Sequence, residues 1–326
     1  MSRCRPRLLS LAIFAALIVF ASLIYQHQEC SEEYSYRIVI LTQNRCASLA
    51  RLLKSLDATK DVHSDEKLLL EIHIDGLQKK VSEKTRTQAR CVQELAKKYS
   101  FRHGDKILRT FKTRRGLQRS WLEAWPTAGD KCDPLTVVLE DDLELSPYWL
   151  RWLRLMWKSY GDRDDLAGIA LNRQQQCAVT GSHGPKCEIA NANKPFLTKI
   201  VGSWGFSPHP QRWREFISSK NEWVKKDPRI DNLGINYWMD DPASKWSVWT
   251  LYYMKWYNKR GLFTLYVTAP GKQALAIHHR EKGEHFSETQ GARYIPLKEW
   301  PEEWNSPPKC LNMFGWDLKK IGEETC

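Results

Sequence analysis

The amino-acid sequence predicts an α/β protein built on a mixed, mainly parallel β-sheet. Two observations support this prediction. First, apolar segments of strand length alternate with amphipathic helical segments four times between residues 37 and 145, and parallel strands require such crossover connections. Second, the last of these strands ends in three consecutive acids within LTVVLEDDLELSP at 135–147, as expected where a buried strand leaves the core.

The strands and helices of the first half follow from the spacing of their apolar residues. RIVILTQ, which begins at Arg37, is a compact apolar strand, and Leu49, Leu52, Leu53 and Leu56 then recur at helical spacing. Further strands are predicted at 67–75, which ends in Asp75-Gly76, and at 106–111, with further helices at 80–99 and 115–125.

The acidic strand carries the strongest chemical signal in the chain. Its β-branched and leucine residues suit a strand covered on both faces, so Glu140, Asp141 and Asp142 are predicted at its tip, outside the core. Ligands of open α/β sheets bind beyond the carboxyl ends of strands, and carboxylates gathered there suit a hard divalent cation that substrate phosphates also hold. The alternative is an acidic turn that favours the dipole of the next helix.

The second half, 146–326, continues with a helix and then loses the regular alternation. Ser146 and Pro147 are predicted as the N-cap and first turn of this helix, followed by a buried stripe through Trp149, Leu153, Met156 and Tyr160. Later strands are predicted at 166–172 and 261–270, with a loop at 278–286. We therefore expect 37–145 and 146–326 to be two parts of one domain, with the second part shaping the site.

The amino terminus predicts a signal anchor. Residues 8–24 contain no charged residue, and this segment is long enough to cross a membrane. Arg3, Arg5 and Arg7 precede it. By the positive-inside rule, residues 1–7 form a cytosolic tail, 25–36 a short stem, and the rest a lumenal domain. A cleaved signal peptide is the alternative.

Charge and cysteine content limit the class of partner. The formal net charge of +12 favours anionic ligands such as nucleotide diphosphates, whereas the scattered lysines and arginines argue against nucleic acid. A lumenal location permits disulfides, and among nine cysteines Cys177 and Cys187 flank a short loop and form the predicted pair. No paired C-x-x-C spacing supports a zinc site.

Aromatic and histidine residues of the second half have two interpretations. Most of the 15 tryptophans are predicted to pack in the core, as for Trp157 and Trp213, while Trp204 is the best placed to stack on a sugar ring. The pair His278-His279 is interpreted as part of a lid or a diphosphate contact rather than as metal ligands.

Several segments in order between residues 37 and 290 resemble a known family. These are ILTQNR, VVLEDDLELSPYWLRWL, VGSWGFSPHPQRWREF and GEHF. With the apolar amino terminus, the chain resembles type II Golgi glycosyltransferases of the GT-A fold, which has a single Rossmann-like nucleotide-sugar-binding domain. It looks most like the N-acetylglucosaminyltransferase I family.

The resemblance implies a donor, an acceptor and a cofactor. The donor would be a UDP-sugar, the acceptor a glycan or glycoprotein in the Golgi lumen, and the cofactor Mn²⁺ held by Asp142 against the donor diphosphate. It also implies that Glu140 and Asp141 face the ribose and sugar, that Asp75 contacts the uracil edge, and that Arg45 lies near the nucleotide.

The catalytic base is the part of the resemblance that fits least well. Inverting transfer requires a carboxylate that deprotonates the acceptor hydroxyl, and in the family this base lies in a W-D-D-W-like loop. Here Asp241, followed by Asp240, is the choice in YWMDDP, with Glu281 and Glu284 as outside candidates. The alternatives to a transferase are a catalytically degenerate glycan- or partner-binding protein and, ranked lower, a metal-dependent phosphate-transfer or hydrolase enzyme.

Overall fold

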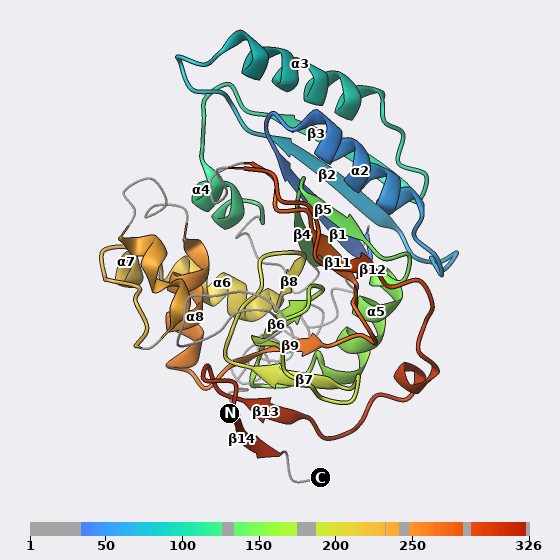
Figure 1. The fold of residues 1–326 in the computed structure, drawn as a ribbon, viewed down its shortest axis with the longest axis vertical. Coiled ribbons are helices and arrows are strands. Elements are labelled where there is room, and N and C mark those ends of the chain that lie inside the picture. Colours follow the sequence, from blue (N-terminus) through green and yellow to red (C-terminus); the bar gives the residue numbers. More distant parts are fainter. Residues whose placement is uncertain are drawn as a thin grey trace, which may run out of the picture.

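Ten strands form one continuous mixed sheet in the computed structural model, in the order β14-β13-β7-β9-β6-β8-β4-β1-β2-β3 (Figure 1). The structure describes residues 34–125, 134–174, 187–231, 233–240, 248–282 and 288–323. The sheet crosses the boundary at 145/146, so the two predicted parts share one sheet. The predicted class, α/β with a mixed sheet, is confirmed.

The four strands of the first half are parallel, as the alternation predicts. They are β1 (Tyr36–Thr42), β2 (Leu68–Ile74), β3 (Gly104–Thr110) and β4 (Leu135–Glu140). The helices α2 (Cys46–Asp57), α3 (Glu83–Lys98) and α4 (Leu117–Leu122) connect them. In register, Leu41 of β1 lies opposite Glu140 of β4, and Thr42 lies opposite Ile74 of β2. The carboxyl ends of these three strands therefore meet at one edge of the sheet.

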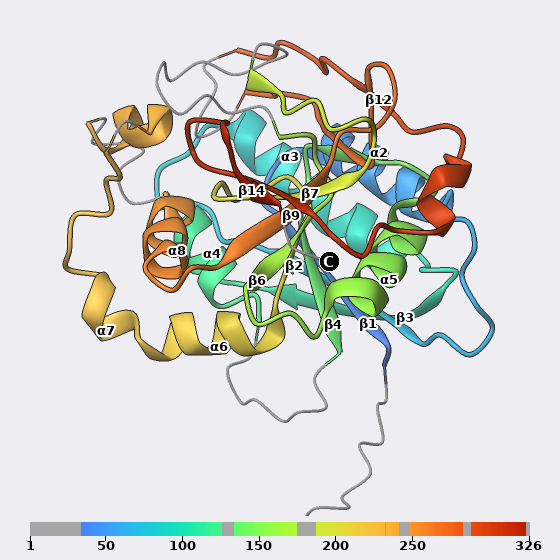
Figure 2. The same ribbon diagram turned by 90° about the horizontal axis from the view of Figure 1, so that it is seen from below.

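The two faces of the sheet are covered by different helices. Ile38 and Ile40 of β1 belong to a core that includes the leucines of α2, whereas Val39 and Leu41 belong to a second core rich in aromatic side chains. Figure 2 shows α4, α6 (Pro210–Ser218), α7 (Lys220–Trp223) and α8 (Trp249–Asn258) on one side of the molecule, with α5 (Trp149–Tyr160) on the other. The predicted core positions Trp157 and Trp213 are buried.

The chain beyond the acids departs from the prediction. The predicted helix is present as α5 with its predicted stripe buried, but Ser146 is not its cap residue. A further strand, β5 (Leu143–Leu145), precedes the helix and pairs antiparallel with β11 (Ala276–His278). The first residue of α5 is Trp149, and its cap position is Tyr148. The Ser146 hydroxyl accepts a hydrogen bond from the Tyr148 amide and donates one to the Leu297 carbonyl. The Ser-Pro signal marks the helix entry, but a distant segment adds a strand that local periodicity does not reveal.

The remaining elements include six strands of the same sheet, a separate two-stranded sheet formed by β10 and β12, and two 3-10 helices, η2 and η3. They are β6 (Leu166–Ala170), β7 (Pro195–Thr198), β8 (Phe206–Pro208), η2 (Gly234–Met239), β9 (Phe263–Val267), β10 (Gln273–Ala274), β12 (Ile295–Pro296), η3 (Glu302–Asn305), β13 (Asn312–Phe314) and β14 (Lys320–Glu323).

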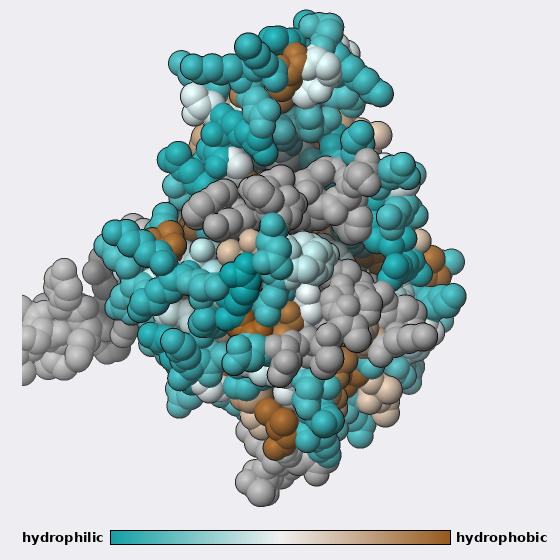
Figure 3. All heavy atoms as spheres, turned by 60° about the vertical axis from the view of Figure 1, so that its left-hand side comes forward, coloured by the Kyte–Doolittle hydropathy of each residue, from teal (hydrophilic) through white to brown (hydrophobic). Residues whose placement is uncertain are grey.

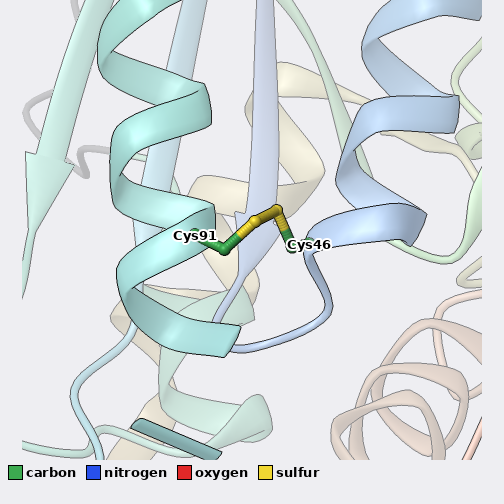
Figure 4. The surroundings of a disulfide bond; sticks show 2 residues. All are labelled: Cys46 and Cys91. Carbon is green, nitrogen blue, oxygen red and sulfur yellow. A yellow bond between two sulfur atoms is a disulfide. The ribbon is translucent and has the colours of Figure 1, made fainter. Parts of the chain in front are cut away.

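A disulfide joins Cys46, the first residue of α2, to Cys91 of α3 (Figure 4). It closes a separation of 45 residues and anchors the start of α2, directly after Arg45. Cys187 is also disulfide-bonded, but Cys177 lies outside the described residues, so their pairing stays a prediction.

The predicted anchor at 8–24, the tail at 1–7 and all of the stem before residue 34 lie outside the described residues. Within the described ranges, no helix has the length and apolar character that a membrane crossing requires.

Glu71 is a buried acid on β2 and predicts a specific acid sensitivity. It accepts from His73 and from Arg109, and it lies 3.3 Å from Arg37. Burial raises its pKa, but these neighbours outweigh burial and lower the pKa from its usual 4.5 to about 2. Ionised Glu71 therefore adds roughly 3 kcal/mol to the free energy of unfolding. This contribution is complete above pH 4.5 and is lost as the pH falls through about 2.

We therefore expect Glu71→Gln to remove this part of the acid dependence. Urea unfolding at pH 6, 4 and 3 should show wild-type stability falling steeply below pH 4.5 and a flatter dependence in the variant. Equal slopes for the two proteins over this range would show that the Glu71 cluster does not set the acid dependence.

Candidate active site

A cavity of about 210 Å³ opens at the carboxyl ends of β1, β2 and β4. Its walls come from residues 41–45, from the loop around 111–117, from 200–204, from 248–250 and from the end of β11. Five residues that the sequence selects line it: Arg45, Asp75, Glu140, Asp141 and Asp142. The structure therefore brings together all the predicted donor and metal residues.

Each acid of the trio is held by a different set of donors. Glu140 accepts a hydrogen bond of 3.0 Å from the Trp121 indole N–H. Asp141 accepts from the Thr42 hydroxyl at 2.6 Å and from the guanidinium of Arg45. Because β1 and β4 are neighbours, Thr42 and Arg45 at the end of β1 reach the acids at the end of β4.

Asp142 is paired with two cationic or potentially cationic side chains. Arg45 Nη1 lies 2.7 Å from Asp142 Oδ2, and His278 Nε2 lies 3.4 Å from the same oxygen. Burial disfavours the ionised form of Asp142, but the charge of Arg45 and the contact with His278 outweigh burial and lower its pKa. Asp142 is therefore the acid of the trio whose ionised form its surroundings favour most.

Burial has the opposite effect on the two other acids. It raises the pKa of Glu140 to about 8, with a further contribution from the charge of Asp142. Burial also raises the pKa of Asp141, although Arg45 and Thr42 oppose it. Three neighbouring acids in a low-dielectric site thus have unequal affinities for protons, as expected when like charges cannot all be ionised together.

The side chains present fit a divalent cation held by one protein carboxylate. Asp142 Oδ1 is buried and has no hydrogen-bond partner among the described residues, although a buried carboxylate oxygen normally has one. Nowhere in the described ranges do three His, Cys, Asp or Glu side chains gather as a metal-binding group. Asp142, with His278 beside it, would hold such a cation, and donor phosphates and water would supply the other ligands.

Asp75 lines the cavity and also orders its wall. Its carboxylate accepts hydrogen bonds from the backbone N–H groups of Gly76, Arg115 and Gly116, at 2.8, 2.7 and 3.0 Å. Gly76 is required here because a Cβ would lie 2.4 Å from the carbonyl carbon of Thr113. The Asp-Gly signal therefore identifies a residue that positions the 113–116 loop, and the uracil contact stays a prediction.

Trp204 and His278 form an aromatic pair on the cavity wall. Their ring centroids are 4.4 Å apart with an interplanar angle of 13°. One face of Trp204 is thus covered by His278, which the β5–β11 pairing carries to the trio. The neighbouring His279 bonds Glu144 at 2.8 Å. The role of His278 next to Asp142 could not be predicted from sequence, since 136 positions separate the two residues.

The candidate bases have different locations. Asp240 is exposed, pairs with Arg229 at 2.6 Å and does not line the cavity. Asp241 and Glu284 lie outside the described residues, although Trp238 and Val248, on either side of Asp241 in the chain, both line the cavity.

Glu281 lines the cavity, but its carboxylate accepts from Ser48 and pairs with Arg51. Burial opposes ionisation of Glu281, and these two contacts outweigh burial and lower its pKa. Its position beside Arg51 identifies Glu281 as a carboxylate engaged by the protein.

No family model matches the chain, and no curated protein matches it. Solved structures with a similar arrangement include residues 1–349 of TarS from S. aureus, with 9% identity, 72% of this chain and 60% of that chain covered, and a TM-score of 0.41.

Two further similar structures are described as transferases. One is the mannosyltransferase PcManGT from Pyrobaculum calidifontis in complex with GDP-Man and Mn²⁺. It has 12% identity, 64% of this chain and 56% of that chain covered, and a TM-score of 0.34. The other is mouse xyloside xylosyltransferase 1, at 12% identity, with 73% of this chain and 87% of that chain covered and a TM-score of 0.39. This chain spans less than two thirds of TarS 1–349 and of PcManGT. At TM-scores below 0.5, these likenesses carry no weight for function, which depends on the site itself.

Proposed function

We propose that the chain is a metal-dependent, inverting glycosyltransferase that moves a sugar from a UDP-sugar to a glycan or glycoprotein. The observation that carries this proposal is the trio Glu140, Asp141 and Asp142 in the lining of a cavity, beside Arg45. The family resemblance adds N-acetylglucosamine as the sugar and the Golgi membrane as the location, with the catalytic domain in the lumen.

The residues of the cavity suit the transfer of a sugar from a diphosphate. Asp142 has a buried oxygen that lacks a hydrogen-bond partner among the described residues and can hold a cation. A divalent cation would offset charge on the departing diphosphate. Arg45 offers a second, permanent positive charge at the same place. Asp75 fixes the loop at 113–116 on which the nucleotide would lie. Asp241 is the proposed base, because residues on both sides of it in the chain line the cavity.

The proposal is tested by incubating the full-length chain with a panel of UDP- and GDP-sugars and a mixed glycan acceptor. Release of nucleotide should require one UDP-sugar and Mn²⁺, and a chelator should stop it. A glycan product with inverted anomeric configuration, detected by NMR, would support direct displacement. Absence of nucleotide release from every donor, with and without acceptor, would contradict the proposal.

A second candidate is a degenerate glycan-binding protein. Among the described residues, the acids that line the cavity are Asp75, the trio and Glu281. Glu281 is paired with Arg51 and Ser48, and this observation favours the second candidate. This candidate predicts that Asp142→Ala binds glycans as tightly as the wild type and that neither protein turns over a donor. The transferase predicts turnover in the wild type alone.

A further inference from the structure

A second cavity adjoins the candidate active site. It has a volume of about 600 Å³ and is lined by residues 114–119, 122 and 123 and by Lys220 and Val224 of the α7 region. Arg114, Gly116 and Leu117 line both cavities. One extended molecule could therefore occupy the second cavity and reach the first.

The lining of this second cavity is strongly basic. Its ten residues include four cations, Arg114, Arg115, Arg119 and Lys220, and one acid, Glu123. Glu123 accepts from both Arg115 and Arg119, the latter at 2.8 Å, so a single carboxylate is shared by two guanidinium groups. The chain from 106 to 122 contains six lysines and arginines and no acid. Among the residues that line the cavity, positive charges therefore outnumber negative ones.

The four cations differ in exposure. Arg115 has a side chain that is 8% exposed and stacks on Phe111, with its Cζ 4.0 Å from the ring centroid. It is thus part of the wall. In contrast, the Arg119 side chain is 62% exposed, and Arg114 and Lys220 are also exposed. The surrounding face, on the side of α4 and α7, is mainly hydrophilic (Figure 3). These cations can meet a ligand from solvent without unfolding any element.

We propose that this cavity binds an anionic group, a sulfate or carboxylate, on the saccharide acceptor, an inference that rests on the proposed glycosyltransferase function. Arginine forks match the paired oxygens of sulfate and carboxylate, and lysine adds a point charge. A neutral sugar would gain little from four cations that it partly desolvates. Because the second cavity shares a wall with the cavity of the candidate active site, the anionic group would lie next to the site of transfer. The second cavity would therefore select acidic over neutral acceptors.

The test measures saccharide binding directly, without turnover. The probes are a sulfated chondroitin tetrasaccharide, the same chain without sulfate, and a neutral N-acetylglucosamine tetramer, each titrated calorimetrically into the full-length chain. We expect measurable binding of the anionic chains that weakens with added salt, because exposed charges are screened. The double variant Arg119→Gln/Lys220→Gln should weaken this binding about 5- to 30-fold. The matched control is Lys97→Gln/Lys158→Gln, on exposed positions of α3 and α5, which should bind as the wild type does.

The outcomes separate this inference from the proposed function. Comparison of the sulfated and non-sulfated chains identifies which anionic group is preferred. Equal binding of neutral and anionic chains, or equal loss in the control variant, would overturn the inference. If UDP and Mn²⁺ bind but no anionic saccharide does, the inference fails and the transferase stands. If the anionic saccharide binds through Arg119 and Lys220 but no nucleotide sugar is bound or turned over, the transferase fails and the anion site stands.

Discussion

Replacement of Asp142 by Asn is expected to reduce donor turnover by about 10²- to 10³-fold, the loss typical when one preorganised electrostatic group is removed. The surroundings of Asp142 lower its pKa, and its buried Oδ1 has no hydrogen-bond partner among the described residues. An amide keeps the shape of the side chain but cannot supply the charge that a divalent cation requires. Initial rates of nucleotide release at several Mn²⁺ concentrations measure the effect, and excess Mn²⁺ should restore little of the activity.

The matched control is Asp317→Asn, in which a surface carboxylate beside Lys319 loses the same charge. It should keep wild-type rates. Thermal unfolding of both variants separates a loss of chemistry from a loss of folding. If Asp142→Asn retains turnover within about threefold of the wild type while Mn²⁺ is still required, the cation is held elsewhere and the assignment of Asp142 is wrong.

The sheet and the acidic tip could be predicted because both depend on local patterns. Apolar runs of strand length, with amphipathic segments between them, identify β1, β2, β3 and β4 and their parallel direction. Burial of β4 explains why its acids lie at the end of the strand. Parallel neighbours in register then bring Arg45, Asp75 and the trio to one edge. For the trio, the strand end was sufficient to predict a site, whereas the expectation that Arg45 and Asp75 lie at the same site came from the family resemblance.

The partners of the acids could not be predicted because they depend on tertiary pairing. His278 reaches Asp142 through the short β5–β11 ribbon, and Trp121 reaches Glu140 from α4. Neither segment has a periodicity that distinguishes a site residue from a core residue. The Cys46–Cys91 bridge likewise depends on α2 packing beside α3. For Asp75, the sequence predicted a place at the site but not the hydrogen bonds that its carboxylate accepts from three backbone amides.

Arg45 balances the charge of two buried acids, and a bound cation would do the same. Its guanidinium contacts both Asp141 and Asp142, whose side chains are 2% and 6% exposed. Arg45→Gln leaves these buried acids without their permanent cation, and breaking a buried ion pair typically costs about 3–5 kcal/mol. The raised proton affinity of Asp141 limits this cost, because the acid can take up a proton instead. We expect a loss of about 2–4 kcal/mol in the free energy of unfolding at neutral pH.

Mn²⁺ should restore much of this loss, because a cation bound at Asp142 replaces the charge of the guanidinium and stabilises the folded state by mass action. The thermal midpoint of Arg45→Gln is therefore expected to rise more on addition of Mn²⁺ than that of the wild type, in which the cation must share Asp142 with Arg45. Arg51→Gln is the control, since Arg51 lies on α2, which Arg45 directly precedes, and pairs with Glu281 rather than with the trio. It should show the wild-type response to Mn²⁺. An identical metal-induced shift in all three proteins would mean that Arg45 and the cation do not act on the same carboxylates, and the proposed site for the cation would then have to move away from Asp142.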